Sequence, residues 1–185
     1  MPELLRLEHF GFTYPQQPRP ALADVSLTVR QGEFWVLCGA SGCGKTTLLR
    51  QLKPALRPHG AAEGCILFDG QPLDDLPPHR QAADIGFVLQ SPEEQTVTDK
   101  VWHELAFGLE SLGCDTPSIR RRVAEMASFF GIQDWFHRKV DELSGGQKQL
   151  LALASVMVLQ PRLLILDEPT CLLYTSPSPR DKRQS

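Results

Sequence analysis

Polar and apolar residues alternate along much of the first thirty positions, which is typical of strands that bury one face. Residues 5–14 predict one such strand and residues 22–29 a second, followed by a turn at Gln31-Gly32. Residues 34–38 are instead a continuous apolar run, the pattern of a short strand buried on both faces. The chain is therefore predicted to begin with an antiparallel, hairpin-rich part and then to enter a buried strand.

The spacing of apolar residues becomes helical from residue 98. Val101, Leu105 and Leu109 lie four positions apart, and residues 119–130 continue the helical period after a break at 113–117. The alternation of strands and helices predicts an α/β layer fold with a helical insertion over residues 98–140. The other predicted elements are a helix over 45–52, strands over 65–68, 85–89 and 163–166, and a helix that follows Ser144 and runs to Val158.

The composition narrows the classes of function. With 185 residues, 42% of them hydrophobic and 22% charged, the chain has the composition of one globular domain. Its net charge of −3 and the lack of a basic run disfavour nucleic acid as a partner. The most apolar stretch, residues 150–159, is far shorter than the roughly 20 residues that span a membrane, and the first six residues show no secretory signal. The predicted location is therefore cytoplasmic.

Residues 39–46, Gly-Ala-Ser-Gly-Cys-Gly-Lys-Thr, match the phosphate-loop pattern G-x-x-x-x-G-K-[ST] between a predicted strand and a predicted helix. Glycines let consecutive backbone N–H groups and the positive end of the helix face a phosphate. Lys45 is then expected to reach the β- and γ-phosphates of ATP, and the Thr46 hydroxyl to bind Mg²⁺. The alternative is a glycine-rich turn without a ligand. The predicted nucleotide ligands of this loop are Gly39, Ser41, Gly42, Cys43, Gly44, Lys45, Thr46 and Thr47.

The apolar strand predicted at residues 163–166 ends in two acidic residues. Beside the phosphate-loop strand it would bring Asp167 to the magnesium ion and Glu168 to the γ-phosphate. Glu168 is therefore predicted to be the catalytic residue that orients or deprotonates the attacking water. A buried strand that ends in two acids is common by chance, so this interpretation depends on the phosphate loop.

Residues 143–147, Leu-Ser-Gly-Gly-Gln, stand at a predicted helix start between the phosphate loop and the acidic strand. With them the chain resembles an ATP-binding-cassette (ABC) ATPase over residues 3–170. The resemblance implies an α/β P-loop NTPase fold of the ABC nucleotide-binding type. That fold would have an N-terminal antiparallel β part, a helical subdomain over about 98–150, as the family pattern implies, and an incomplete C-terminus.

The same resemblance implies a dimer with a second ABC ATPase subunit, either another copy or a paralogue. Tyr14 matches the aromatic residue that stacks on adenine. The signature residues would contact the ATP held by the other subunit; they are Ser144, Gly145, Gly146 and Gln147.

Gln90 follows a predicted strand and matches the family's Q-loop glutamine, which contacts Mg²⁺ and the attacking water. It therefore joins Lys45 and Glu168 as a predicted catalytic residue, and Thr46 and Asp167 as a predicted metal ligand.

Residues 90–95 and 106–110 resemble the energy-coupling-factor (ECF) branch of the family. That resemblance implies an importer of a vitamin or a transition-metal ion, with a transmembrane coupling subunit and a substrate-binding membrane subunit. The ATPase would lie peripherally on the inner face of the cell membrane. The alternatives are an ABC ATPase of another transporter class and a soluble ABC ATPase without a transport function.

Residues 171–185 depart from the family pattern, which continues with a Leu-Asp loop, a further strand and a histidine. They resemble, codon for codon, the translation of a widely used transposase sequencing adapter. The expectation is a truncated ABC domain over residues 1–170 that carries a non-native, disordered tail. By itself, such a 185-residue chain is expected to lack ATPase activity.

Overall fold

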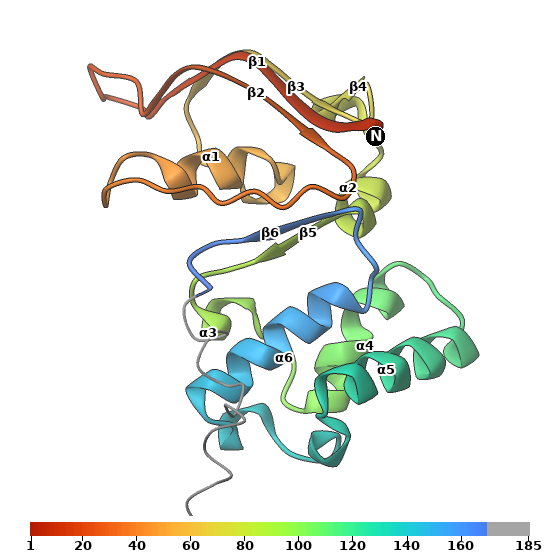
Figure 1. The fold of residues 1–185 in the computed structure, drawn as a ribbon. Helices are drawn as coiled ribbons and strands as arrows, with labels where there is room; N and C mark the ends of the chain where they lie inside the picture. Colours follow the sequence, from red (N-terminus) through yellow and green to blue (C-terminus); the bar gives the residue numbers. More distant parts are fainter. Residues whose placement is uncertain (170–185) are drawn as a thin grey trace, which may run out of the picture. The chain divides into compact units, whose positions relative to one another are not determined.

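The chain divides into two units, the first comprising Met1–Ile85 and the second beginning at Gly86. A four-stranded antiparallel sheet forms the body of the first unit. The structure, a computed structural model, describes residues 1–169 (Figure 1), and the predicted tail at 171–185 lies outside the described residues. The strand order is β2-β1-β3-β4, with β1 Glu3–Thr13, β2 Leu22–Arg30, β3 Ala61–Phe68 and β4 Gln71–Pro72. This confirms the predicted antiparallel beginning.

A bulge in β1 explains why its apolar pattern slips by one position. Leu5 and Leu7 are buried on the inner face, and the next buried side chains are Phe10 and Phe12. The pairing of β1 with β2 shifts register between Leu7 and Phe10, where His9 has a φ of 49°. Since an extra residue in a bulge returns the side chains that follow to the same face, both apolar pairs reach the core.

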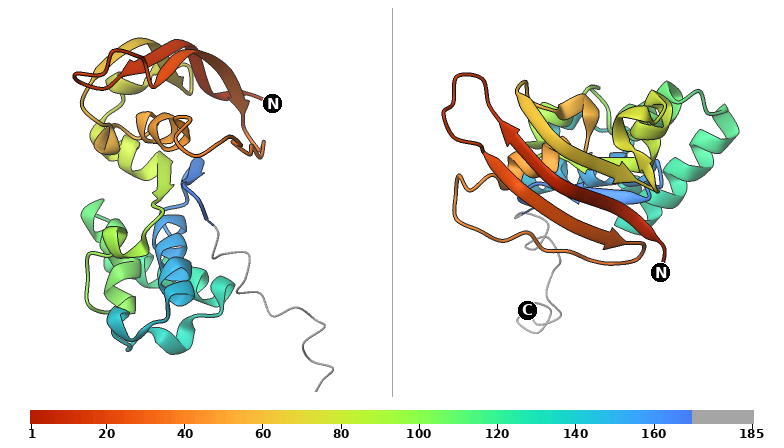
Figure 2. Two further views of the ribbon diagram at one scale, coloured as in Figure 1. Left: turned by 90° about the vertical axis from the view of Figure 1, so that its left-hand side faces the viewer. Right: turned by 90° about the horizontal axis from the view of Figure 1, so that it is seen from above.

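Helix α1, Lys45–Gln51, follows the glycine-rich loop and lies against one face of the sheet (Figure 2). Leu48, within the helix, and Leu52, its C-terminal cap residue, are both buried. The helix was predicted at this place. Helix α2, Pro78–Asp84, was not predicted, because its seven residues are too few to establish a helical period.

The strand predicted at residues 34–38 is wrong. This run forms no strand among the described residues, and its side chains face solvent: Phe34 is 88% exposed and Val36 69%. An apolar run becomes a buried strand only where neighbouring strands pair with it and both faces are covered. In this unit β1, β2, β3 and β4 pair with one another, and none of them pairs with this run.

In the second unit, two short strands pair with each other: β5, Ile85–Val88, and β6, Leu163–Leu166. Their arrows point the same way in Figure 1. Both strands lie where they were predicted. A Cβ on Gly86 would lie only 2.5 Å from Cγ1 of Val156 and 2.9 Å from Cγ of Pro161, so β5 packs closely against the segment that leads into β6.

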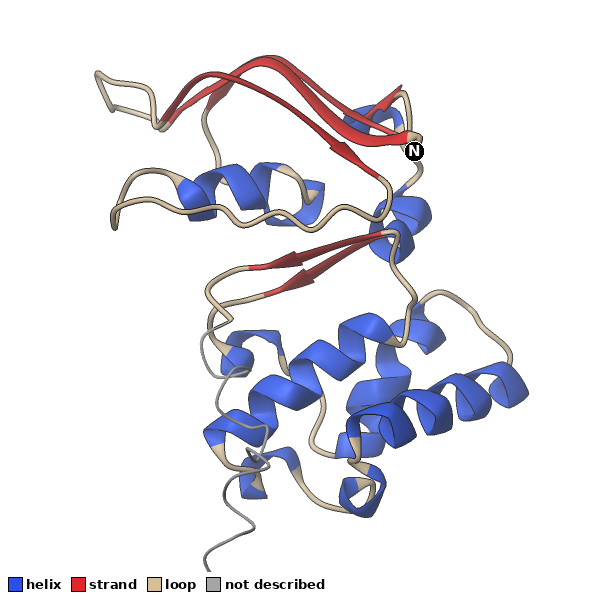
Figure 3. Cartoon of the chain, viewed as in Figure 1, coloured by secondary structure: helices blue, strands red, loops and turns tan. Residues whose placement is uncertain are grey.

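Three helices enclose the apolar core of the second unit (Figure 3): α4 Val101–Ser111, α5 Thr116–Phe130 and α6 Gly145–Met157. Most of the positions that set the predicted period are buried, and Val101, Leu105, Leu109 and Val123 have no exposed surface. Helix α5 begins inside the predicted break, because a proline fits the first turn of a helix. Within residues 1–169, every helix falls short of the length and apolar character needed to cross a bilayer.

The remaining elements are short. Helix α3, Pro92–Gln95, has four residues and was not predicted. The 3-10 turns are η1 Pro54–Leu56, η2 Leu73–Asp75, η3 Gln133–Trp135 and η4 Val140–Glu142.

Candidate nucleotide-binding site

The glycine-rich loop has a backbone that only glycine accommodates at one central position. Gly44 caps the start of α1 with a φ of 95°, in the left-handed region that L side chains rarely adopt. A Cβ there would also lie 2.8 Å from the carbonyl oxygen of Ala21. Gly42 has a φ of 78° as well. The two glycines therefore shape the turn that leads from the loop into the helix.

The Lys45 ammonium is held inside this loop. Its Nζ donates to the carbonyl oxygens of Gly39 and Ala40, both at 2.9 Å. Helix α1 has no side-chain cap at its N-terminus, and the first N–H groups of a helix have no acceptor within the helix. A cation and the N-terminus of a helix at one loop are features that accept a phosphate, so this part of the chain fits ATP.

Tyr14 lies beside the start of α1. Its hydroxyl is 3.0 Å from Oγ1 of Thr47, and its ring meets the ring of Phe12 edge to face, with centroids 4.9 Å apart. The first unit thus brings together the predicted adenine-stacking residue and one residue of the predicted phosphate loop.

In the second unit, Gln90 and Glu168 meet although they are 78 positions apart in the sequence. Nε2 of Gln90 donates to Oε2 of Glu168 at 2.7 Å. The two residues follow β5 and β6, and the backbone N–H of Asp167 donates to the carbonyl of Val88 at 3.0 Å. Pairing of the two strands therefore brings the predicted Q-loop glutamine to the predicted catalytic carboxylate.

The two acids after β6 have different surroundings. Asp167 is buried, with 3% of its surface exposed, whereas Glu168 is exposed. Glu168 has a φ of 51°, a left-handed conformation that is uncommon for a residue with a side chain and is found often at functional sites. Carboxylate and hydroxyl oxygens are ligands that Mg²⁺ accepts, so Asp167 and Thr46 suit that ion chemically. Thr46 belongs to the first unit and Asp167 to the second.

The signature residues form the start of α6. Ser144 is the N-terminal cap: its side chain accepts from the backbone N–H of Gln147 at 3.4 Å, and Oε1 of Gln147 accepts from the N–H of Ser144 at 2.9 Å. This reciprocal capping box fixes the beginning of the helix. The space around the Cα of Gly145 is open, with no atom within 4 Å of the place a Cβ would take. An incoming anionic group could therefore approach this helix end closely.

Three polar residues hold neighbouring segments in ways that the sequence did not predict: Lys53, Gln95 and Glu104. Nζ of Lys53, one residue beyond the cap of α1, donates to the carbonyls of Gln81 at 2.7 Å and Ile85. Burial lowers the pKa of Lys53 to about 8. The sequence shows these residues as polar side chains near apolar neighbours. It does not tell which backbone groups each side chain binds.

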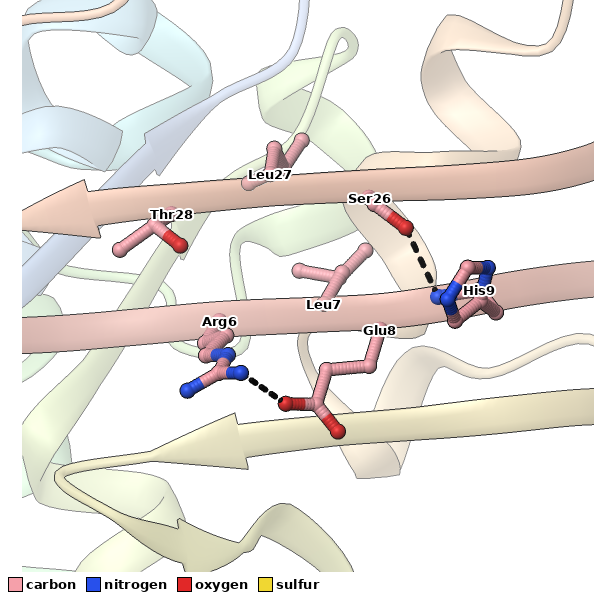
Figure 4. A pocket seen from close by; sticks show the side chains of 7 residues that line it. All are labelled: Arg6, Leu7, Glu8, His9, Ser26, Leu27 and Thr28. Atoms are coloured by element: carbon pink, nitrogen blue, oxygen red, sulfur yellow. Dashed lines mark hydrogen bonds and ion pairs between the residues drawn. The ribbon is translucent and has the colours of Figure 1, made fainter.

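An open pocket of about 500 Å³ lies on the sheet of the first unit, along residues 6–9 of β1 and 26–28 of β2 (Figure 4). Its polar groups bind one another: Arg6 pairs with Glu8, and the backbone N–H of His9 donates to Oγ of Ser26 at 2.9 Å. None of the predicted site residues lines this pocket. The candidate site residues therefore lie away from this pocket, in the phosphate loop of the first unit and, separately, after β5 and β6 in the second unit.

The fold and the loop define a P-loop nucleotide-binding domain of the ABC ATPase type. A model of the family described as ABC transporter matches residues 22–171, and the chain belongs to this family. A solved structure of CbiO1 from Clostridium perfringens, described as part of the ABC transporter complex CbiONQ, has the same fold with a TM-score of 0.80. It is 30% identical in sequence, and the match covers 93% of this chain and 68% of that one.

Three relatives of known sequence extend the comparison. A Bacillus cereus protein, named for ATP binding in an ABC transporter, is 48% identical over 167 residues, which are 90% of this chain and 30% of that protein. The cobalt import ATP-binding protein CbiO of Syntrophus aciditrophicus is 37% identical, and the match covers 97% of this chain and 62% of that protein. The ECF transporter ATP-binding protein EcfA1 of Lactobacillus delbrueckii is 34% identical, and the match covers 92% of this chain and 60% of that protein. The chain thus spans between 30% and 62% of the lengths of these relatives.

Proposed function

We propose that this chain is the ATP-binding and ATP-hydrolysing part of an ECF-type importer that takes up a vitamin or a transition-metal ion. The observation that carries the ATPase proposal is the 2.7 Å contact between Gln90 and Glu168 at the ends of two paired strands. Support for the import function comes from the relatives CbiO and EcfA1, which are named for cobalt import and for an ECF transporter.

In this proposal the phosphate loop binds the nucleotide and Tyr14 stacks on adenine. Lys45 would exchange the carbonyls of Gly39 and Ala40 for the β- and γ-phosphates, because a phosphate oxygen is a stronger partner for an ammonium than a neutral carbonyl. The loop amides and the start of α1 would stabilise the developing negative charge. The proposed contacts remain those of Gly39, Ser41, Gly42, Cys43, Gly44, Lys45, Thr46 and Thr47.

The hydrolytic step is assigned to the second unit. Glu168 would accept the proton of the attacking water, and Gln90, which already binds the Glu168 carboxylate, would orient that water. Mg²⁺, when bound with ATP, would neutralise charge on the phosphate oxygens. Its proposed protein ligands, Thr46, Gln90 and Asp167, rest on the sequence motifs.

A second ABC ATPase subunit completes the proposed site. Ser144 to Gln147 start a capped helix whose first turn is open to an approaching group, as a contact to ATP on a partner requires. Because that contact is made across a dimer, two such subunits would be needed for turnover. A transmembrane coupling subunit and a substrate-binding membrane subunit would hold the pair on the inner face of the membrane.

A different transporter class is the second candidate. It is favoured by the Bacillus cereus relative, of which the 167 matched residues are only 30%, so that the whole relative is more than three times as long as the match. Such a length leaves room for further domains that an importer subunit of the CbiO kind does not need.

The proposal is tested with the full-length protein. We expect it to bind MgATP, to hydrolyse it, and to do so faster together with its membrane subunits. Uptake of radiolabelled cobalt, nickel and vitamins by cells with and without the gene then identifies the cargo. Turnover of ATP without any dependence of uptake on the gene would favour the second candidate, and no binding of MgATP would refute the ATPase proposal itself.

A further inference from the structure

The side chain of Gln95 joins two parts of the second unit. Its Oε1 accepts from the backbone N–H of Leu89 at 3.0 Å, and its Nε2 donates to the carbonyl oxygen of Ala152 at 3.2 Å. Leu89 directly precedes Gln90, and Ala152 lies on α6, the helix that starts at the signature residues. One amide thus connects the backbone next to Gln90 with the signature helix.

Gln95 lies on α3, and a second contact between α3 and α6 reinforces this connection. Nζ of Lys148 on α6 is 3.3 Å from Oε1 of Glu93 on α3. Lys148 and Ala152 are four residues apart and so lie on one face of α6, one turn from each other. The Glu93 side chain is 75% exposed, so solvent screens its ion pair with Lys148. We therefore expect this ion pair to be weaker than the hydrogen bonds of Gln95.

The segment that follows α3 is anchored as well. Oε2 of Glu104, a residue of α4 that is 5% exposed, accepts from the backbone N–H groups of Val97 and Thr98 at 3.1 and 2.9 Å. The hydroxyl of Thr98 donates to the same oxygen at 3.0 Å. The segments on both sides of α3 are thus hydrogen-bonded, and a movement of α3 away from α6 would break the bond from Gln95 to Ala152.

We propose that Gln95 is a positioning residue that ties Gln90 to the signature helix. A displacement of α6 would pull on the Ala152 carbonyl, and the Gln95 amide would pass this movement to the Leu89 N–H and so to Gln90. Gln90 in turn holds Glu168, so the position of the signature helix controls whether the carboxylate and the glutamine are set for hydrolysis. This inference rests on the proposed ATPase function.

A glutamine is required for this connection because it must accept and donate at once. A glutamate keeps the acceptor for Leu89 but turns a carboxylate toward the Ala152 carbonyl, which has no proton to give. A leucine of similar size keeps neither hydrogen bond. Both substitutions therefore break the bridge, and they differ only in the bond to Leu89.

The test compares ATP hydrolysis by the full-length protein with that of its Gln95→Leu and Gln95→Glu variants. We expect both variants to lose about tenfold in kcat, the size of effect that one lost positioning hydrogen bond produces. The KM for ATP should stay within about twofold, because the phosphate loop is untouched. Glu94→Gln is the matched control, since Glu94 is an exposed neighbour on α3, and it should keep the parental kcat.

A second measurement follows the Leu89 amide directly by hydrogen exchange. Exchange should become about tenfold faster in Gln95→Leu and stay slow in Gln95→Glu, because only the leucine removes the acceptor. A parental kcat in either variant, or equal Leu89 exchange in Gln95→Leu and the parent, would overturn the proposal. If Gln95→Leu does not fold, kcat and Leu89 exchange in Gln95→Glu decide. A parent that turns over no ATP refutes the proposed function instead, and the exchange comparison still tests the bridge.

Discussion

The two units hold their candidate site residues by different means. In the first unit the backbone arranges the candidate residues: glycines with positive φ shape the loop, and Lys45 is bound by two carbonyl oxygens. In the second unit side chains do this: Gln90 binds Glu168, and Ser144 and Gln147 cap each other.

This difference decides how each unit responds to substitution. A loop that is shaped by its backbone depends on its glycines and on one cation. A single substitution at one of these residues is therefore expected to abolish its function. A side-chain network spreads its function over several hydrogen bonds, whose energies are not independent.

The largest effect is expected from Lys45→Ala in the first unit. The variant loses the charge that we propose to meet the β- and γ-phosphates, so MgATP binding should fall below detection by calorimetry. The fold should persist, because the contacts that the Lys45 side chain makes in the described part of the chain are with the loop carbonyls and the nearby Cys43 sulfur.

Lys100→Ala, at an exposed lysine of the second unit, is the matched control and should keep the parental affinity. If a folded Lys45→Ala protein binds MgATP as tightly as the parent, then the loop is not the phosphate site.

Glu168→Gln is expected to have the next largest effect, and it probes the second unit. The amide keeps the shape of the side chain and removes the proposed base, so kcat should fall by about 10²–10⁴ while ATP binding persists. Steady-state hydrolysis and binding of a fluorescent ATP analogue separate the two quantities. Glu125→Gln on the exposed side of α5 serves as the control. Turnover at the parental rate in Glu168→Gln would mean that another group takes the proton.

The contrast between the units also explains what the sequence could predict. The phosphate loop was predictable because its glycines and lysine are consecutive residues that act locally. The contact of Gln90 with Glu168 spans 78 positions and depends on the pairing of β5 with β6, which periodicity alone does not give; the family motifs pointed to both residues without fixing their distance.

Two apolar runs show the same limit within the fold. Residues 163–166 form a strand as predicted, because β5 pairs with them. Residues 34–38 have an equally apolar pattern and form none among the described residues, since the strands of their unit pair with one another. An apolar run predicts a strand only as far as a neighbouring strand is available.

Gly86→Ala should lower the stability of the second unit without touching the site chemistry. The added methyl group would lie 2.5 Å from Cγ1 of Val156 and 2.9 Å from the ring of Pro161, neither of which can move easily. Overpacking of this kind costs about 1–3 kcal/mol of unfolding free energy. The measurement is urea unfolding followed by circular dichroism.

A second substitution, Val156→Ala, makes room for the methyl group and should restore part of the loss in the double variant. Additive destabilisation in the double variant would show that the two side chains do not compete for the same space.

The smallest expected effect concerns Lys53 in the first unit, where a side chain rather than the backbone loop holds two segments together. Burial lowers the pKa of Lys53 from 10.5 to about 8, so the unfolded chain binds more protons than the folded one between these two values. The free energy of unfolding should therefore rise as the pH increases from 8 to 10.5, by on the order of 1 kcal/mol once solvent screening of this partly exposed group is allowed for. Below pH 8 both states carry the proton and the full cost of the buried charge is present.

Lys53→Met should abolish this rise, whereas Lys100→Met at an exposed position should keep it. An equal pH dependence in the Lys53→Met variant and the parent, measured by urea unfolding, would show that Lys53 titrates in the folded unit as it does in water.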